Sequence, residues 1–237
     1  LFNLFVFFEI LLIASYSLLL HGGGRERIRA GLHYVILNLV GSALFLITIG
    51  VLYGMTGALN LADLAVRIAA APAADAGLLR AGALLLLVVF GLKAAVLPLY
   101  FWLPAAYASA SAPVAALFAL LTKVGVYSII RVFSLAFGPA AGAAADVATP
   151  WLLPLALATL LAGGFGVLAS QDSRRLIAYS IIVSIGALLA GIGLVFGLLG
   201  PNWVLGWLHR RYVRQIRNGL ADTLDLMVIC AEAGLGL

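Results

Sequence analysis

Three ionisable side chains stand in the middle of long apolar segments, namely Glu9, Lys93 and Lys123. An ionisable group at the centre of a membrane helix costs about 2.5–3.5 kcal/mol on insertion scales, so these positions favour a functional role. Burial disfavours the charged form of an amine, and a buried lysine can therefore gain and lose a proton that a nearby carboxylate controls. We expect the three residues to form a proton relay.

A purely structural role is the alternative for these groups. Each lysine stands roughly ten residues, or about 15 Å of helix, from either end of its segment, which is too far for its amine to reach the interface. A Glu9–Lys93 pair that only holds two helices together stays open, because buried ion pairs also occur without a function. Such a pair leaves Lys123 without a partner.

The segment that carries Lys93 is interrupted by proline. The stretch "GLKAAVLPLYFWLP", residues 91–104, contains two prolines, and each removes a helical hydrogen bond. Irregular backbone at membrane depth is tolerated where it is buried in protein or lines a water-filled cavity, and transporters place ion sites at such breaks. We therefore predict a broken helix beside a cavity. The residues expected at the break or lining this cavity are Pro98, Tyr100, Pro104, Tyr107, Ser109, Ser111 and Thr122.

The composition identifies the class of protein. Of the 237 residues, 65% are hydrophobic and 10% are charged, whereas soluble domains contain about 25% charged residues. The chain is therefore an integral membrane protein. Its net charge of +5 comes mainly from arginines near the ends of apolar segments, which favours anchoring at the cytoplasmic face over binding to nucleic acid.

Several other kinds of site are not expected from the sequence. There is a single cysteine, Cys230, so an internal disulfide is excluded, and no cluster of metal ligands, serine–histidine pairing or nucleotide loop stands in the sequence. We expect neither metal nor cofactor, and a transporter in place of an enzyme. Because the chain opens within an apolar run and without methionine, it is predicted to be an internal piece of a longer protein.

Six apolar runs are long enough to cross a bilayer, which takes about 20 helical residues. They lie near 1–20, 32–56, 79–103, 113–136, 150–170 and 176–199. Lipid offers the backbone no hydrogen-bond partner, so these runs must be helices. The expected fold is an all-α membrane protein with six transmembrane helices, the third of them broken. The nearly neutral stretch 57–78 is expected to hold a short surface helix.

The connectors 21–31 and 170–176 carry many of the arginines and enclose four spans, which places both on the cytoplasmic side. The sixth span should then deliver residue 200 to the outside. The tail 200–237 is nevertheless basic, with Trp203, Trp207, Arg210, Arg211, Arg214 and Arg217. We predict that this tail is a separate part, an amphipathic helix at the headgroup boundary.

The spans also resemble a known family. The stretch 91–133, with "LKAAVLPLYFWLP" and "LLTKVGVY", resembles blocks shared by proton-translocating antiporter-like membrane subunits. Residues 33–65 and 173–194 narrow the resemblance to the D subunit of Mrp (Mnh, Pha) cation/proton antiporters, over about 1–199. The cousins in respiratory complex I are expected to read "LPDAH" where this chain has "LPAAY".

This resemblance implies a subunit with fourteen helices, of which the chain supplies the fifth to the tenth. It places Glu9 at the essential glutamate of the fifth helix, Lys93 at the lysine of the broken seventh, and Lys123 at the lysine of the eighth. The implied function is exchange of Na⁺ or K⁺ for protons in the bacterial inner membrane. The implied partners are the lipid bilayer and the other subunits of a hetero-oligomeric complex.

Two alternatives remain open. One is a proton-pumping membrane subunit of an NADH:quinone oxidoreductase-type complex, with the same relay. The other is of a different class: the tail resembles the start of the F domain in Tad (TadC) and type II secretion proteins, at Asp222, Asp225, Leu226 and Glu232. That resemblance predicts a secretion scaffold, or a second source for the residues that follow about 195–201.

Overall fold

The computed structural model describes residues 1–195, and this part of the chain is helical without strands. The helices are α1 (Phe2–Leu20), α2 (Arg25–Thr56), α3 (Leu61–Ala69), η1 (Ala73–Asp75), α4 (Ala76–Ala94), α5 (Trp102–Ser109), α6 (Ala112–Leu135), η2 (Gly142–Ala144), α7 (Thr149–Ala169) and α8 (Ser173–Val195). Within the described residues, α1, α2, α4, α6, α7 and α8 are long and apolar enough to cross a membrane. This confirms the predicted all-α membrane fold.

The predicted spans differ from the helices at two places. Helix α2 begins at Arg25 and not at residue 32, because a helix can continue past the apolar layer with its arginines in the headgroup region. The predicted third span, 79–103, is divided: α4 ends at Ala94 and α5 begins at Trp102. The predicted break is therefore present, and it begins three residues before Pro98.

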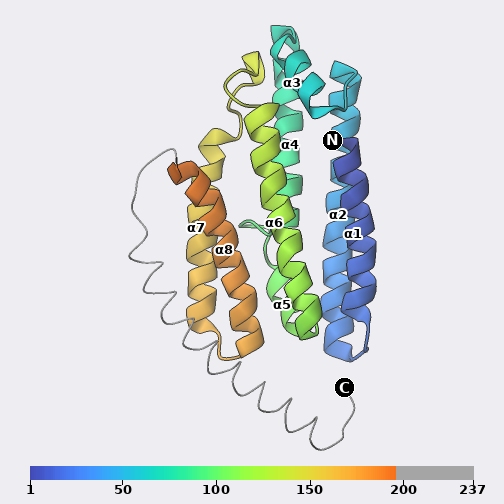
Figure 1. Ribbon diagram of the computed structural model, residues 1–237, viewed down its shortest axis with the longest axis vertical. Coiled ribbons are helices and arrows are strands. Elements are labelled where there is room, and N and C mark those ends of the chain that lie inside the picture. The colour runs from blue at the N-terminus through green and yellow to red at the C-terminus, as the bar shows by residue number, and fades with distance from the viewer. Residues whose placement is uncertain (196–237) are drawn as a thin grey trace, which may run out of the picture. The chain divides into compact units, whose positions relative to one another are not determined.

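Neighbouring long helices run in opposite directions, so the connectors alternate between the two ends of the bundle (Figure 1). The connectors 21–24 and 170–172 lie at the lower end in this view, as predicted, and α3 and η2 lie at the upper end. Five arginines stand at or next to the lower connectors: Arg25, Arg27, Arg29, Arg174 and Arg175. The positive-inside bias predicts that the lower end is the cytoplasmic one.

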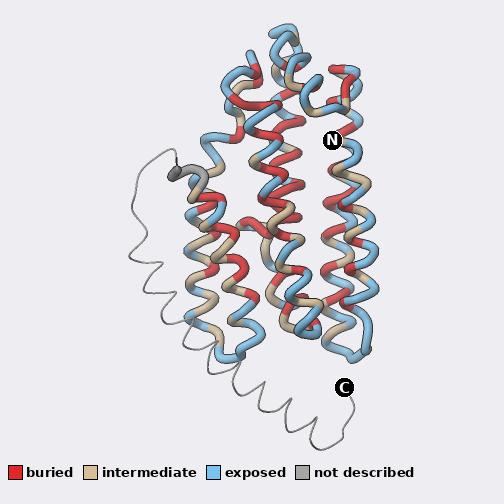
Figure 2. Tube along the Cα trace, viewed as in Figure 1, coloured by how far each residue is buried: buried red, intermediate tan, exposed pale blue. Residues whose placement is uncertain are grey.

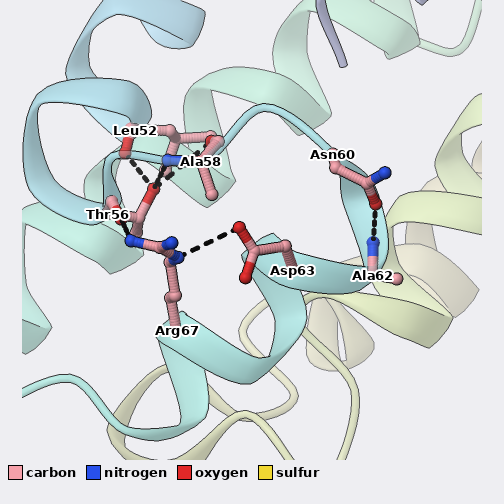
Figure 3. Close-up of polar contacts among 7 residues, drawn as sticks. All are labelled: Leu52, Thr56, Ala58, Asn60, Ala62, Asp63 and Arg67. Atoms are coloured by element: carbon pink, nitrogen blue, oxygen red, sulfur yellow. Dashed lines mark hydrogen bonds and ion pairs between the residues drawn. The ribbon is translucent and has the colours of Figure 1, made fainter.

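The expected surface helix within 57–78 is α3, and the α2–α3 turn is held by polar contacts (Figure 3). The side chain of Asn60 caps α3 by accepting from the Ala62 amide at 2.9 Å. Arg67 donates to the Thr56 carbonyl at 2.9 Å and pairs with Asp63 at 3.1 Å. Because Arg67 satisfies a carbonyl at the end of α2, it fixes α3 against that helix end.

Helix α4 lies between α2 and α6 and is the most deeply buried helix of the described bundle (Figure 2). A Cβ added at Gly41 of α2 would lie 2.6 Å from a methyl of Leu92. A Cβ added at Gly125 of α6 would lie 2.7 Å from the Ala94 amide nitrogen. Glycine on both sides thus lets the two neighbouring helices approach the end of α4, where Lys93 is placed.

Helices α7 and α8 form a second close pair. A Cβ added at Gly186 of α8 would lie 2.5 Å from the Leu160 amide nitrogen, and one at Gly163 of α7 would lie 2.8 Å from the Val183 amide nitrogen. Large apolar side chains such as Leu161, Phe165 and Leu168 are exposed on the outer face of α7. An outer surface of this kind suits contact with lipid or with other membrane helices.

Candidate functional site

Glu9 and Lys93 face each other across α2. The Lys93 Nζ lies 4.0 Å from the Glu9 Oε1. Between them, the Ser42 hydroxyl of α2 accepts a hydrogen bond from the Lys93 Nζ at 3.2 Å and donates a short one to the Glu9 carboxylate. The Lys93 side chain is 2% exposed and that of Glu9 is 28% exposed. The three side chains therefore form one hydrogen-bonded chain across α1, α2 and α4.

An aromatic ring completes the surroundings of the Lys93 amine. The Nζ lies 5.0 Å from the centre of the Phe8 ring, within the range in which a cation is attracted to a ring face. Since Phe8 precedes Glu9 on α1, one helix supplies both a carboxylate and a ring to the same amine.

Lys123 has a separate partner. Its Nζ donates to the Ser184 hydroxyl of α8 at 2.6 Å, and that hydroxyl donates to the Ile181 carbonyl at 2.9 Å. The sequence shows no carboxylate partner for Lys123, and the structure supplies a hydroxyl in its place. A hydroxyl oxygen, like a carboxylate oxygen, can accept a hydrogen bond from an ammonium group, and it adds no charge to the membrane interior.

The helices that carry the two lysines meet close to both residues. Ala94, next to Lys93, touches Gly125, which follows Lys123 by two residues. Among the hydrogen bonds and ion pairs of the described residues, none joins the Glu9–Ser42–Lys93 chain to the Lys123–Ser184 pair. The structure thus shows two polar clusters near the α4–α6 contact, with no hydrogen bond between them.

The backbone of the break finds its hydrogen-bond partners within the protein. After Ala95, whose φ is 57°, the Val96 amide donates to the Gly91 carbonyl at 2.8 Å. The next amide, that of Leu97, donates to the Thr159 hydroxyl of α7 at 2.9 Å. The Trp102 indole nitrogen donates to the Leu92 carbonyl at 3.1 Å. Side chains therefore take over the bonds that the helix loses, as irregular backbone in a membrane requires.

Two cavities adjoin the break. An apolar cavity of about 270 Å³ is lined by Pro98 and by residues of α4, α6, α7 and α8. A more polar cavity of about 740 Å³ lies at the connector 170–172 and is lined by Tyr100, Pro104, Gln171, Asp172, Arg175 and Tyr179 among others. Three of the predicted lining residues, Pro98, Tyr100 and Pro104, thus face cavities.

The other predicted lining residues take part in local contacts. The Tyr107 hydroxyl donates to the Phe118 carbonyl at 2.6 Å, and the buried Thr122 hydroxyl donates to the Ala119 carbonyl at 3.1 Å. The Ser109 carbonyl accepts from Arg27 at 2.9 Å, which ties α5 to the start of α2. Ser111 is exposed just before α6.

Sequence reasoning missed the serines of the site, Ser42 and Ser184, and also Thr159. Each is a hydroxyl residue within a long apolar run, where it stands out less than a charge does. Their signal in the sequence is their depth: each lies well inside a predicted span. Among the described residues, no group of three or more histidine, cysteine, aspartate or glutamate side chains could hold a metal ion.

Comparison with known proteins gives the family. Residues 1–200 match the family described as NADH:quinone oxidoreductase/Mrp antiporter, transmembrane. The chain belongs to this family. A member from Rhizobium meliloti, named as the D subunit of a probable K⁺/H⁺ antiporter, is 54% identical over 242 residues, which cover 98% of this chain and 45% of that protein. The D subunit of the Bacillus subtilis Na⁺/H⁺ antiporter is 46% identical over 195 residues, covering 81% of this chain and 38% of that protein.

Solved structures of the antiporter family share the fold. A chain of the Mrp complex from Dietzia sp. DQ12-45-1b matches with a TM-score of 0.70 and 31% identity, over 85% of this chain and 36% of that one. A chain of respiratory complex I from Thermus thermophilus matches with a TM-score of 0.67 and 29% identity, over 81% and 40%. The chain therefore spans less than half the length of the relatives that it matches.

The tail lies outside the described residues, and so does the amphipathic helix predicted there. The family match ends at residue 200, but the alignment with the Rhizobium meliloti protein covers 98% of the chain and so extends well into 200–237. These relatives give no support to the resemblance with secretion proteins. A separate origin for the tail stays a prediction.

Proposed function

We propose that this chain is the part of a monovalent cation/proton antiporter's D subunit that moves protons through Glu9, Lys93 and Lys123. It would work as a secondary transporter component in the bacterial inner membrane, within a multi-subunit complex that exchanges Na⁺ or K⁺ for protons. The names of the antiporter relatives and the Mrp neighbour support this function.

The hydrogen-bonded chain from Glu9 to Lys93 is the observation that carries the proposal. A buried amine next to a carboxylate that is partly exposed can pass a proton in either direction when the carboxylate changes its charge. A structural ion pair alone would be served better by direct contact, whereas these two groups lie 4.0 Å apart with a hydroxyl between them. Lys123, on the neighbouring helix α6, offers the next amine.

A proton-pumping subunit of a respiratory complex is the second candidate. The match to respiratory complex I favours it, because its TM-score is nearly that of the Mrp match. One assay distinguishes the two functions. If the chain belongs to an antiporter, membranes that contain the full-length subunit with its partner subunits should exchange Na⁺ or K⁺ for protons without NADH. If proton movement required NADH, the respiratory function would replace the antiporter.

The relay itself is tested in the same membranes. Lys93→Ala and Glu9→Gln should each abolish exchange while the complex still assembles. Arg67→Ala is the matched control, since it also removes a charged side chain but at the exposed α2–α3 turn (Figure 3), and it should leave the exchange rate within about twofold of the wild type. Undiminished exchange in Lys93→Ala would remove the basis of the proposal.

A further inference from the structure

Ser42 lies between the two charged groups of the site, a position that its residue type alone does not predict. Its hydroxyl contacts both charged groups, while the Lys93 Nζ and the Glu9 Oε1 lie 4.0 Å apart, beyond hydrogen-bond distance. A hydroxyl has one hydrogen to donate and two lone pairs to accept with. Here the Ser42 hydroxyl donates its hydrogen to the Glu9 carboxylate, and one of its lone pairs accepts a hydrogen from the Lys93 amine. Each hydrogen bond therefore has its donor on the Lys93 side and its acceptor on the Glu9 side.

Two other buried hydroxyls, those of Thr48 and Ser128, bond only within their own helices. Thr48 on α2 donates to the Leu44 carbonyl of its own helix at 2.7 Å, and Ser128 on α6 donates to the Val124 carbonyl at 2.8 Å. Such bonding back to the preceding turn is the usual arrangement for hydroxyls in membrane helices. Ser42 instead gives its hydrogen to a side chain of another helix.

The packing holds Ser42 at this place. Its neighbour Gly41 packs against Leu92, which precedes Lys93. Ser42 itself is 5% exposed. The position of the hydroxyl opposite the amine is therefore set by the close contact of α2 with α4.

We propose that Ser42 is a further member of the relay, and that the proton passes between Lys93 and Glu9 through its hydroxyl. This inference rests on the proposed function. In the step, the Lys93 ammonium loses one N–H bond and its proton binds the Ser42 oxygen. The original Ser42 O–H bond breaks at the same time, and that proton binds the Glu9 carboxylate. Amine, hydroxyl and carboxylic acid result, no proton is gained or lost overall, and the reverse step restores the charges.

The test replaces the hydroxyl in the full-length subunit, assembled with its partners in everted membrane vesicles, and measures Na⁺/H⁺ and K⁺/H⁺ exchange per assembled complex. Ser42→Ala should lower the maximal rate about ten- to a hundredfold, which is the range expected when a hydrogen bond to a charged group is lost. The cation concentration at half-maximal rate should stay the same. Ser42→Gly, a second variant without the hydroxyl, should behave like Ser42→Ala, and Ser42→Thr, which keeps the hydroxyl, should restore most of the rate.

Ser128→Ala is the matched control, because it makes the same change at a similarly buried serine whose hydrogen bond stays within its own helix. It should leave the rate unchanged. A normal rate in Ser42→Ala, or a rate in assembled Ser42→Thr as low as in Ser42→Ala, would overturn the role of the hydroxyl. If Lys93→Ala and Glu9→Gln were inactive in the same membranes, the relay would stand and only this inference would fall. If those two variants were active, the proposed function would fall with it.

Discussion

The close contact between α4 and α6 predicts the effect of adding a single methyl group at Gly125. In Gly125→Ala the added carbon would lie 2.7 Å from the Ala94 amide nitrogen and 2.9 Å from the Ala94 Cα, whereas ordinary contacts begin at 3.4 Å. The two backbones must therefore separate by about 0.7 Å. A retreat of α4 would press on α2, because Gly41 of α2 faces the Leu92 side chain on the other side of α4. The shift falls on α6, which carries Lys123.

The expected cost follows from this displacement. Overpacking a close helix contact costs about 1–3 kcal/mol, and the gain of replacing glycine within a helix, about 1 kcal/mol, offsets part of it. A misplacement of about 1 Å can lower a rate about a hundredfold, so a shift of about 0.7 Å should lower exchange about tenfold or more. The variant should melt at a lower temperature in detergent and exchange cations slowly in vesicles.

Gly164→Ala provides the control for this experiment. Gly164 is on α7, and a Cβ there would meet no atom within 4 Å, so its replacement should leave stability unchanged or raise it slightly. If Gly125→Ala and Gly164→Ala showed the same melting temperature and the same exchange rate, the close approach of α6 to α4 would be refuted.

Two further hydroxyls give predictions of their own. Ser184→Ala should lower the exchange rate without loss of assembly, because the Lys123 amine loses its hydrogen-bond partner at 2.6 Å. A normal exchange rate in vesicles would contradict this prediction. Thr159→Val should lower the melting temperature of the full-length subunit, because the Leu97 amide would be left unpaired in the interior at a cost of about 1–3 kcal/mol, while Thr159→Ser should melt like the wild type. Equal melting of the valine and serine variants would argue against that bond.

The helical bundle could be predicted from the sequence because each membrane span is encoded by one long, continuous apolar segment. A run of about 20 apolar residues has to be a helix in lipid, and arginine-rich connectors fix which ends lie together. The break after Lys93 was also readable, since two prolines follow it within a span. The exact end of α4 was not: the helix stops at Ala94, the residue whose carbonyl the Pro98 ring would meet in a continued helix, and the chain turns away through the left-handed conformation of Ala95.

The charged residues of the site could be predicted from the sequence, whereas its hydroxyl residues could not. A lysine in an apolar run is conspicuous because of its cost, so Lys93 and Lys123 could be named at once. A serine costs far less there and satisfies itself within its helix in most cases, so the residue type gives no hint that Ser42 reaches toward α1 or that Ser184 reaches toward α6. Only the packing of the helices decides which hydroxyl meets an amine.

The way in which the Leu97 amide is satisfied bears on how the protein could move. At this point the chain is attached to α7 through one side-chain oxygen and not to its own helix. A rotation of α5 would have to release this bond together with two others, the bond from the Trp102 indole to the Leu92 carbonyl and the bond from Arg27 to the Ser109 carbonyl. A movement of the lower half of the broken helix therefore requires bonds to three different helices, α7, α4 and α2, to open together.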